Sequence, residues 1–227
     1  IGKLSDLWDI STKALLEKTD ASMIPSDDEI KKALTTVDYQ NVVVDGKTVT
    51  LKEPSAKIDL GGIAKGYIAD RMKDYLNQKG AACGYINLGG NVLCLGAKPD
   101  GSSYNIGIQR PFDDEGAAML AVSVTDQTVV SSGVYERYFE VDGKRYHHIL
   151  DTATGYPYDN GLLGVSIITD ESVDGDGLST TCFALGLADG MALVESLDNT
   201  EAVFITEDYE LHFSSGMGTK IPYQVME

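Results

Sequence analysis

The sequence has 227 residues, of which 43% are hydrophobic, so it holds enough apolar material for one large or two small domains. Its formal net charge is -17. This charge argues against binding nucleic acid through the phosphate backbone, which requires clustered Lys and Arg. An anionic ligand would have to be met locally, by helix N-termini, a few cations and a metal ion. No apolar run approaches the length of a membrane span, so we expect a soluble chain.

The cysteines and the first residue of the sequence each limit what the chain can be. The cysteines Cys83, Cys94 and Cys182 are odd in number and form no C-x-x-C pair, so neither a zinc site nor a disulfide framework is indicated. We expect all three to be small buried apolar residues. The chain begins at Ile1 without an initiator Met, which indicates that a segment was removed or that the sequence starts inside a longer protein.

The N-terminal part of the chain predicts two helices and a β-hairpin. Residues 4–8 have the pattern of an amphipathic helix, and Ser-Asp-Asp-Glu at residues 26–29 is a capping box that opens a helix through Leu34. Asp45-Gly46 then separates two β-rich runs, which are residues 42–44 and 48–51. An Asp-Gly pair in this position predicts a hairpin.

Residues 57–80 predict the central element of the fold, a short strand followed by a glycine turn and a helix. Apolar residues recur on one helical face, which we expect to face the core: Ile63, Tyr67, Ile68, Met72, Tyr75 and Leu76. Gly80 falls where a left-handed cap would end the helix. At the other end, Gly61 and Gly62 let the backbone approach a ligand beside Lys65 and the first free N–H groups. This pattern is typical of a phosphate site, although it also forms plain tight connections.

The next part of the chain predicts β-strands at residues 84–88, 91–95, 104–108, 118–124 and 128–131. A second hairpin follows, with strands 135–141 and 144–150 around Asp142-Gly143. A two-residue turn places Tyr138 opposite His147. Because successive strand residues face opposite sides, at most one of His147 and His148 can serve a given site.

The C-terminal part predicts a mixture of strands and helices. Strands are expected at residues 162–169, 202–206 and 211–214, and helices at residues 178–185 and 189–197, separated at Gly186-Leu187. Asp-Gly-Asp-Gly at residues 174–177 is expected to be a loop that enters the first helix. Few strands alternate regularly with helices, so we predict an α+β fold with a mainly antiparallel sheet.

Two groups of residues could act on a phosphate. Asp176 and Thr180 stand one helical turn apart and could give two oxygens to a hard cation, although Asp176 could equally cap the helix. No acidic residue follows where an EF-hand needs its bidentate Glu, so a calcium loop is not indicated. His147 and His148 place an imidazole near Asp151, as a candidate base or as satisfied strand residues. These residues and Lys65 predict a metal-dependent enzyme that acts on a phosphate or diphosphate.

Five motifs occur in the order and approximate spacing of a known family. They are DLGGIAKGYIAD at residues 59–70, NLGGN at 87–91, SSGVYERYF at 131–139, HHILDTATGYP at 147–157 and DGLSTTCFALG at 176–186. Together they resemble the FAD:protein FMN transferases, the ApbE family. The resemblance covers most of the chain and implies one flavin transferase domain over residues 1–227.

The resemblance implies a reaction and a place in the cell. FAD would be bound with Mg²⁺, and its FMN half would be transferred to a threonine hydroxyl of an acceptor flavoprotein, with release of AMP. The family works at the extracytoplasmic face of a bacterial membrane or in the periplasm, so any membrane contact would come from a lipid anchor outside this chain.

The resemblance also assigns roles to single residues. Asp59 and Lys65 match contacts to the flavin nucleotide, and the main chain near Ile149 would lie against FAD. Three residues match metal ligands: Gly62, through its backbone oxygen, Asp176 and Thr180. His148 matches the base that acts on the threonine hydroxyl, whereas His147 stands at a more variable place.

The sequence departs from the family pattern in three places. Thr152 replaces a Pro that is usual there, and residues 7–10 lack glycines that usually follow Trp8. The family's first section, with an early strand and helix and a flavin-contacting Met, has no counterpart upstream of Ile1, so we expect an incomplete fold.

Two other functions fit the same residues. One is a Mg²⁺-dependent FAD pyrophosphatase, in which water replaces threonine and the products are FMN and AMP. The other is a flavin-carrying acceptor or electron-transfer module, because residues 176–181 loosely resemble the acceptor's modification motif. Thr181 and Cys182, however, stand where that motif requires Ala and Thr.

Overall fold

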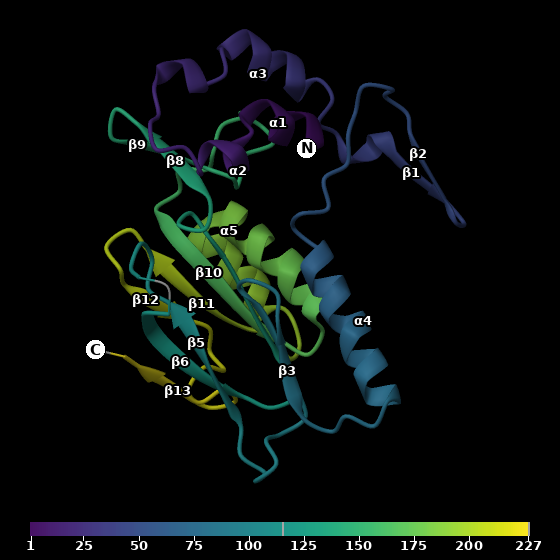
Figure 1. The fold of residues 1–227 in the computed structure, drawn as a ribbon, viewed down its shortest axis with the longest axis vertical. Coiled ribbons are helices and arrows are strands. Elements are labelled where there is room, and N and C mark those ends of the chain that lie inside the picture. The colour runs from purple at the N-terminus through teal and green to yellow at the C-terminus, as the bar shows by residue number, and fades with distance from the viewer. Residues whose placement is uncertain (115, 227) are drawn as a thin grey trace. The chain divides into compact units, whose positions relative to one another are not determined.

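The computed structural model describes residues 1–114 and 116–226, which divide into two compact units (Figure 1). Unit 1 consists of Ile1–Leu60 and Val134–Asp159, and unit 2 consists of Gly61–Gly133 and the chain from Asn160 onward. This division does not test the prediction that residues 1–227 form a single family domain, which stays a prediction.

Unit 1 combines short helices with two hairpins. Its helical elements are α1 (Gly2–Trp8), α2 (Ile10–Lys13), η1 (Ala21–Met23), α3 (Asp27–Leu34) and η2 (Tyr39–Asn41). Trp8 is fully buried and stacks on Tyr146 with ring centroids 5.6 Å apart, and its Nε1 donates to the Gly155 carbonyl at 2.7 Å. The predicted capping box is confirmed, because the backbone N–H of Ser26 donates to Glu29 Oε2 at 2.9 Å and the Glu29 N–H donates to Ser26 Oγ at 3.4 Å.

Both predicted hairpins are confirmed, although the first turns at Gly46-Lys47 instead of Asp45-Gly46 and the second is shorter than expected. The first pairs β1 (Val42–Asp45) with β2 (Thr48–Leu51), and the second pairs β8 (Tyr138–Val141) with β9 (Lys144–His147). Asp142 and Gly143 have φ of 50° and 77°, as a tight hairpin turn requires. Tyr138 lies opposite His147, which is the predicted register.

Unit 2 contains a six-stranded and a three-stranded sheet. The six-stranded sheet has the order β12-β11-β10-β7-β4-β3, and the smaller sheet has the order β13-β6-β5. Their strands are β3 (Gly84–Asn87), β4 (Asn91–Leu95), β5 (Tyr104–Gln109), β6 (Ala118–Val124), β7 (Thr128–Gly133), β10 (Leu162–Thr169), β11 (Glu201–Thr206), β12 (Leu211–Phe213) and β13 (Tyr223–Val225). All pairings between these strands are antiparallel, which confirms the predicted α+β class. β13 was not predicted from the sequence.

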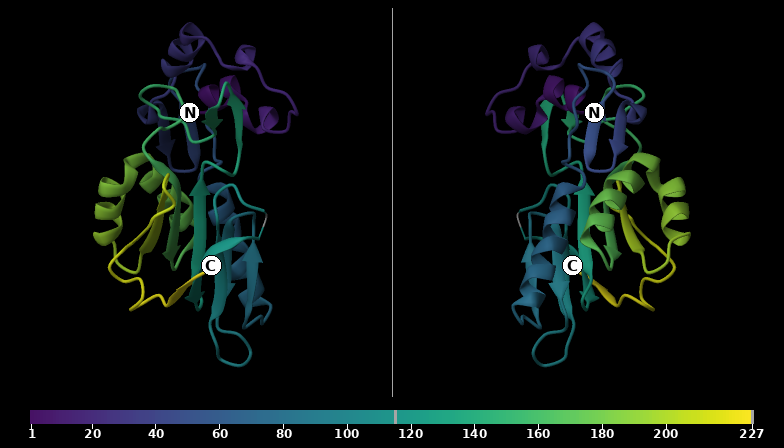
Figure 2. Two further views of the ribbon diagram at one scale, coloured as in Figure 1. Left: turned by 90° about the vertical axis from the view of Figure 1, so that its left-hand side faces the viewer. Right: turned by 90° about the vertical axis from the view of Figure 1, so that its right-hand side faces the viewer.

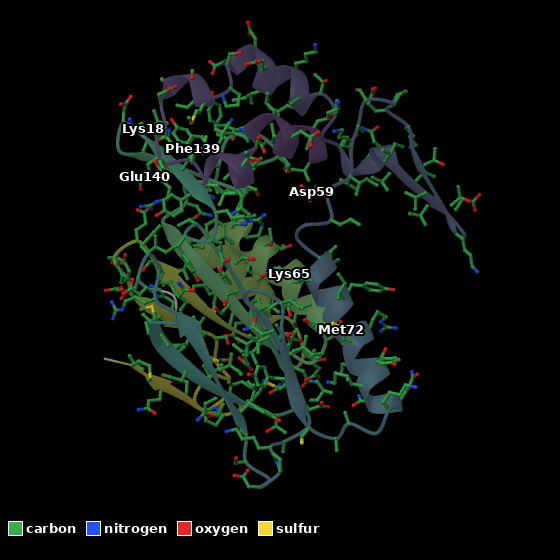
Figure 3. All side chains as sticks on the ribbon, in the orientation of Figure 1. Lys18, Asp59, Lys65, Met72, Phe139 and Glu140 are labelled. Atoms are coloured by element: carbon green, nitrogen blue, oxygen red, sulfur yellow. The ribbon has the colours of Figure 1, made fainter. Side chains whose placement is uncertain are left out.

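Two helices, α4 (Ala64–Gln78) and α5 (Ser172–Glu195), pack side by side on one face of the larger sheet (Figures 1 and 2). The predicted cap of α4 is confirmed, because Gly80 has φ 86° and the Ala81 N–H donates to the Leu76 carbonyl at 3.0 Å. The predicted core face of this helix is wrong except at Leu76, which is partly buried and packs against a buried cluster of unit 2. Ile63, Tyr67, Ile68, Met72 and Tyr75 are 41–60% exposed, whereas Gly66, Ala69 and Asp70 are buried (Figure 3 labels Met72).

α5 differs from prediction at its start. Residues 174–177, expected to be a loop, lie in the first turns of the helix, and Asp176 therefore does not cap it. A glycine suits position 175 although it is a poor helix former, because the helix packs closely on β7 and an added Cβ would lie 2.9 Å from Val130 Cγ2. The predicted break at Gly186 is confirmed by its φ of 80° and ψ of 179°.

α5 also corrects the expectation that no segment reaches the length of a membrane span. By length and a mean hydropathy of 1.4 over its best window, this helix could cross a membrane. It is, however, interrupted at Gly186 and buries Cys182, Phe183 and Val194 against neighbouring elements of unit 2. Only 28% of that apolar stretch is buried in the structure, so the helix is not deeply buried, and one helix of this length and hydropathy is weak evidence for a membrane span.

The cysteine prediction is partly confirmed. Cys94 and Cys182 are buried, and burial raises the pKa of both thiols to about 11. Both therefore remain uncharged thiols at neutral pH and behave as small apolar residues. Cys83 is exposed, so for this residue the prediction is wrong.

Candidate functional site

The predicted metal ligand Asp176 lies in α5 with only 4% of its surface exposed. Its Oδ2 accepts a hydrogen bond at 2.8 Å from the backbone N–H of Gly66, in the first turn of α4. No basic side chain in the described part of the chain forms an ion pair with Asp176. A buried carboxylate without a cation is costly, so this position favours a bound cation.

Thr180 and Gly62 lie close to each other beside this carboxylate. Thr180 follows Asp176 by four residues, so both side chains point to the same side of α5. A Cβ on Gly62 would lie 3.7 Å from Thr180 Oγ1, which brings the segment before α4 close to the hydroxyl. Thr180 Oγ1 also lies 3.2 Å from Ser132 Oγ on β7. Unit 2 therefore brings together all three predicted metal ligands.

These residues fit a hard cation. They offer a carboxylate, a hydroxyl and a backbone carbonyl, which are the oxygen donors that Mg²⁺ and Ca²⁺ take. Oδ1 of Asp176 accepts no hydrogen bond from the described residues, so it is available to an ion. In residues 1–114 and 116–226, no three His, Cys, Asp or Glu side chains lie together in an arrangement that could hold a metal ion. The donor set therefore resembles a Mg²⁺ site completed by a substrate's phosphate oxygens, and not a closed protein cage.

Lys65 is tied to a second motif of the chain. The Nζ of Lys65, a residue labelled in Figure 3, donates at 2.7 Å to the carbonyl of Gly89, in the turn between β3 and β4. Gly89 and Gly90 have φ of 63° and 83°, and Asn87 Oδ1 accepts a hydrogen bond from the Gly89 N–H at 3.1 Å. An ammonium group has three donors, so this contact leaves two for a ligand. The structure thus joins the motifs at residues 59–70 and 87–91 beside the start of α4.

Sequence reasoning missed Asp70. This residue on α4 is 4% exposed, and its two carboxylate oxygens accept hydrogen bonds at 2.8 Å each from the backbone N–H groups of Ser172 and Val173. It therefore caps α5 from a different helix. The only signal in the sequence is its spacing from Gly66, because residues four apart share a helical face.

His147 is a structural residue of unit 1. Its Nε2 lies 2.8 Å from the Tyr158 carbonyl, and its Nδ1 accepts a hydrogen bond from the Ile149 N–H at 3.3 Å. These contacts require a neutral ring with the proton on Nε2. Burial also lowers the pKa of His147 below its usual value of 6.5. Both observations fit the prediction that this histidine does not act as the base.

The remaining predicted site residues also lie in unit 1. His148 is half-buried, and its Nδ1 lies 3.3 Å from the Arg137 carbonyl. Ile149 is buried, and its carbonyl accepts a hydrogen bond from the Tyr158 N–H at 3.1 Å. Asp59 is exposed near the end of the first segment of this unit (Figure 3). Within unit 1 the side chains of His147 and His148 thus have different partners, as their alternation predicts.

Known proteins are similar to this sequence over most of its length. A sequence model of the ApbE family matches residues 1–204. A FAD:protein FMN transferase of Klebsiella pneumoniae (strain 342) is 42% identical over 217 residues, which are 95% of this chain and 65% of that protein. A FAD:protein FMN transferase of Treponema pallidum (strain Nichols) is 35% identical and covers 97% of this chain and 63% of its own length. The chain thus spans slightly less than two thirds of the length of these relatives.

Solved structures share the fold. The ApbE protein from Thermotoga maritima has a TM-score of 0.80 at 34% identity, covering 94% of this chain and 68% of that one. The flavinyl transferase ApbE of Pseudomonas stutzeri, in its apo form, has a TM-score of 0.77 at 29% identity, covering 94% and 65%. From the family match over residues 1–204 and these similarities, we conclude that the chain belongs to the ApbE family.

Proposed function

We propose that the protein transfers the FMN half of FAD to a threonine hydroxyl of an acceptor flavoprotein, using Mg²⁺ and releasing AMP. The observation that carries this proposal is the buried carboxylate of Asp176, which lies beside Gly62 and Thr180 and has one oxygen that accepts no hydrogen bond from the described residues. Such a donor set suits a Mg²⁺ ion on a diphosphate. The names of the relatives, FAD:protein FMN transferase, support the choice of substrate.

The proposed reaction exchanges one phosphorus–oxygen bond for another. The threonine oxygen bonds to the phosphorus of the FMN phosphate, the bond from that phosphorus to the bridging oxygen breaks, and AMP leaves with the bridging oxygen. His148 takes the threonine proton, which is the role of a general base. His147 takes no part, because both its ring nitrogens are engaged within unit 1.

Residues of unit 2 would bind the diphosphate. Asp176, Thr180 and the carbonyl of Gly62 would hold the metal ion, which neutralises phosphate charge and stabilises the leaving group when it is bound. Lys65 and the two N–H groups of α4 that precede the Gly66 N–H, which donates to Asp176, would bind phosphate oxygens, because a helix N-terminus attracts anions. In unit 1, Asp59 and the main chain near Ile149 would contact the flavin nucleotide.

The decisive experiment supplies the protein with FAD, Mg²⁺ and a peptide that carries the acceptor's threonine motif. We expect peptide-bound FMN and an equal amount of AMP. Free FMN with AMP, at the same rate with and without peptide, would instead identify a pyrophosphatase. Fluorescence that stays on the protein in a denaturing gel, after incubation with a known flavin transferase and FAD, would identify an acceptor.

The same assay tests the metal site. Asp176→Ala should abolish Mg²⁺-dependent turnover, because the only carboxylate among the proposed ligands is lost. Asp174→Ala is the matched control, since this exposed acidic residue lies two positions earlier in the same helix. Full activity of Asp176→Ala at limiting Mg²⁺ would refute the metal assignment.

A further inference from the structure

α4 and α5 are capped by each other's side chains. The residue before α5, Glu171, makes no capping hydrogen bond, and the N–H groups of Ser172 and Val173 donate instead to Asp70 of α4. In the opposite direction, the N-cap residue of α4 makes no capping hydrogen bond, and the Gly66 N–H donates to Asp176 of α5. Each helix therefore depends on a buried carboxylate of the other to satisfy its N-terminal N–H groups.

The two helices touch through their backbones where these caps lie. A Cβ on Gly66 would lie 2.2 Å from the Ser172 carbonyl oxygen and 2.7 Å from Val173 Cα. Gly66 and Asp70 are four residues apart on α4, and Ser172 and Asp176 are four residues apart on α5, so each pair shares a helical face. The contact is therefore a clamp with two carboxylate links, one turn apart along each helix.

One of the two carboxylates in this clamp is the proposed metal ligand. Thr180 lies one turn beyond Asp176 on the same side of α5, whereas Gly62 lies just before α4. The metal site is thus divided between the two helices that the clamp holds together. Mg²⁺ requires ligand oxygens at about 2.0–2.1 Å in near-ideal octahedral geometry, so a shift of about 1 Å between the helices would spoil the site.

We propose that Asp70 is a positioning residue for the metal site: it holds the first turn of α5 in place on α4 so that Asp176 and Thr180 stand at the right distance from Gly62. Asp70 does not touch the ion in this role. The inference rests on the proposed function, because it concerns the same Mg²⁺ ion.

The first test measures metal binding directly, with Mn²⁺ as an ion visible by electron paramagnetic resonance. The full chain is titrated with Mn²⁺ and competed with Mg²⁺. Asp70→Asn keeps the shape of the side chain but replaces one acceptor oxygen with a donor, and it should weaken Mn²⁺ binding at least tenfold. Unchanged Mn²⁺ affinity in this variant would overturn the inference.

A control separates positioning from general stability. Glu201 is a buried carboxylate of the same unit, and it accepts hydrogen bonds from the Gly216 N–H at 3.0 Å and from Ser214 Oγ at 2.5 Å. Its other oxygen accepts a hydrogen bond from Lys220 Nζ at 3.0 Å, and none of these three partners belongs to α4 or α5. Glu201→Gln should lower the unfolding temperature about as much as Asp70→Asn and leave the Mn²⁺ dissociation constant within twofold. Equal weakening of Mn²⁺ binding in both variants would overturn the inference.

A second variant tests whether Asp70 serves only as a cap. Glu171 has the extended backbone of an N-cap residue, with φ −105° and ψ 131°, and Asp is a much better N-cap than Glu. Glu171→Asp added to Asp70→Asn should restore thermal stability and leave Mn²⁺ binding weak. Recovery of both would show that Asp70 only caps α5. An unmodified chain that binds no Mn²⁺, with or without FAD, would instead refute the metal assignment and this inference together.

Discussion

Replacing Gly66 with Ala should push α4 and α5 apart. The added Cβ would lie 2.2 Å from the Ser172 carbonyl oxygen, and both groups belong to backbones that no side-chain rotation can move. To bring this contact to an ordinary van der Waals distance, the two helices must move apart by about 1 Å. This movement breaks the 2.8 Å hydrogen bond from the Gly66 N–H to Asp176. Overpacking costs about 1–3 kcal/mol and loss of a hydrogen bond to a charged group about 1.5–3 kcal/mol, while Ala returns about 1 kcal/mol of helix propensity. The free energy of unfolding should therefore fall by about 1.5–5 kcal/mol.

Gly177→Ala is the matched control for this change. Gly177 also lies in the helix pair, but a Cβ there meets no atom within 4 Å, so the substitution should be neutral or stabilise the protein by up to about 1 kcal/mol. Urea unfolding followed by far-ultraviolet circular dichroism reports the helices, and fluorescence of the single Trp, Trp8, reports unit 1. A Gly66→Ala variant as stable as Gly177→Ala would refute the close backbone contact.

Three further predictions concern the ligand contacts and the two histidines. Lys65→Ala should weaken FAD binding about tenfold with little loss of stability, because its contact to the Gly89 carbonyl is at the surface; an unchanged affinity in a fluorescence titration would remove Lys65 from the nucleotide site. His148→Ala should lower FMN transfer about a hundredfold to ten-thousandfold, whereas His147→Gln should retain most of it, and the reverse order in a transfer assay would show that the base was assigned to the wrong histidine. The folded protein binds fewer protons at His147 than the unfolded chain does, because burial lowers its pKa. Its stability should therefore be full above about pH 6.5 and fall as the pH drops from there toward the folded pKa, and His147→Gln should flatten this dependence in urea titrations at several pH values.

Local signals in the sequence were sufficient for most strands and for both hairpins, although they did not reveal β13. Asp142-Gly143 forms the turn of the second hairpin, with positive φ at both residues. The first hairpin turns at Gly46-Lys47, one residue later than the Asp-Gly pair, and has φ 56° at Gly46. The alternation of side chains within the second hairpin predicts that His147 and His148 face opposite sides, and the two side chains have different partners. β4, β6 and β10 have the predicted bounds, since each is a run of apolar and β-branched residues ended by turn residues.

The sequence misled where packing between helices overrides hydrophobic pattern. On α4 the apolar residues Tyr67, Ile68 and Met72 suggested a core face, but they are exposed. The face with Gly66 packs on α5 instead, because the missing side chain of Gly66 allows contact with the backbone of that helix. A pattern of large apolar residues cannot reveal a contact that depends on a missing side chain.

The start of α5 was missed for a related reason. Asp-Gly-Asp-Gly is a poor helix sequence, and its own N-cap residue makes no capping hydrogen bond. The cap comes from Asp70, which is 102 residues away in the chain, so no local window contains the cause. For the proposed metal ligands, the sequence spacing of Asp176 and Thr180 predicted that they share one face of a helix. Their proximity to Gly62 could not be predicted, because it depends on the long-range contact between α4 and α5.

The glycines of α5 and its neighbour explain why a helix of poor intrinsic propensity holds the proposed ligands. Each Gly in a helix costs about 1 kcal/mol relative to Ala, yet three of them stand at close contacts. Gly66 faces the Ser172 carbonyl, Gly175 would place a Cβ 2.9 Å from Val130 Cγ2, and Gly190 would place one 2.7 Å from the Cys182 carbonyl oxygen. At each position a larger residue would move α5 away from α4, from the sheet, or from its own second half beyond Gly186. Helix propensity is therefore low at the positions where a side chain would displace Asp176 and Thr180. Such a conflict between local helix propensity and the observed helix is expected at a functional element.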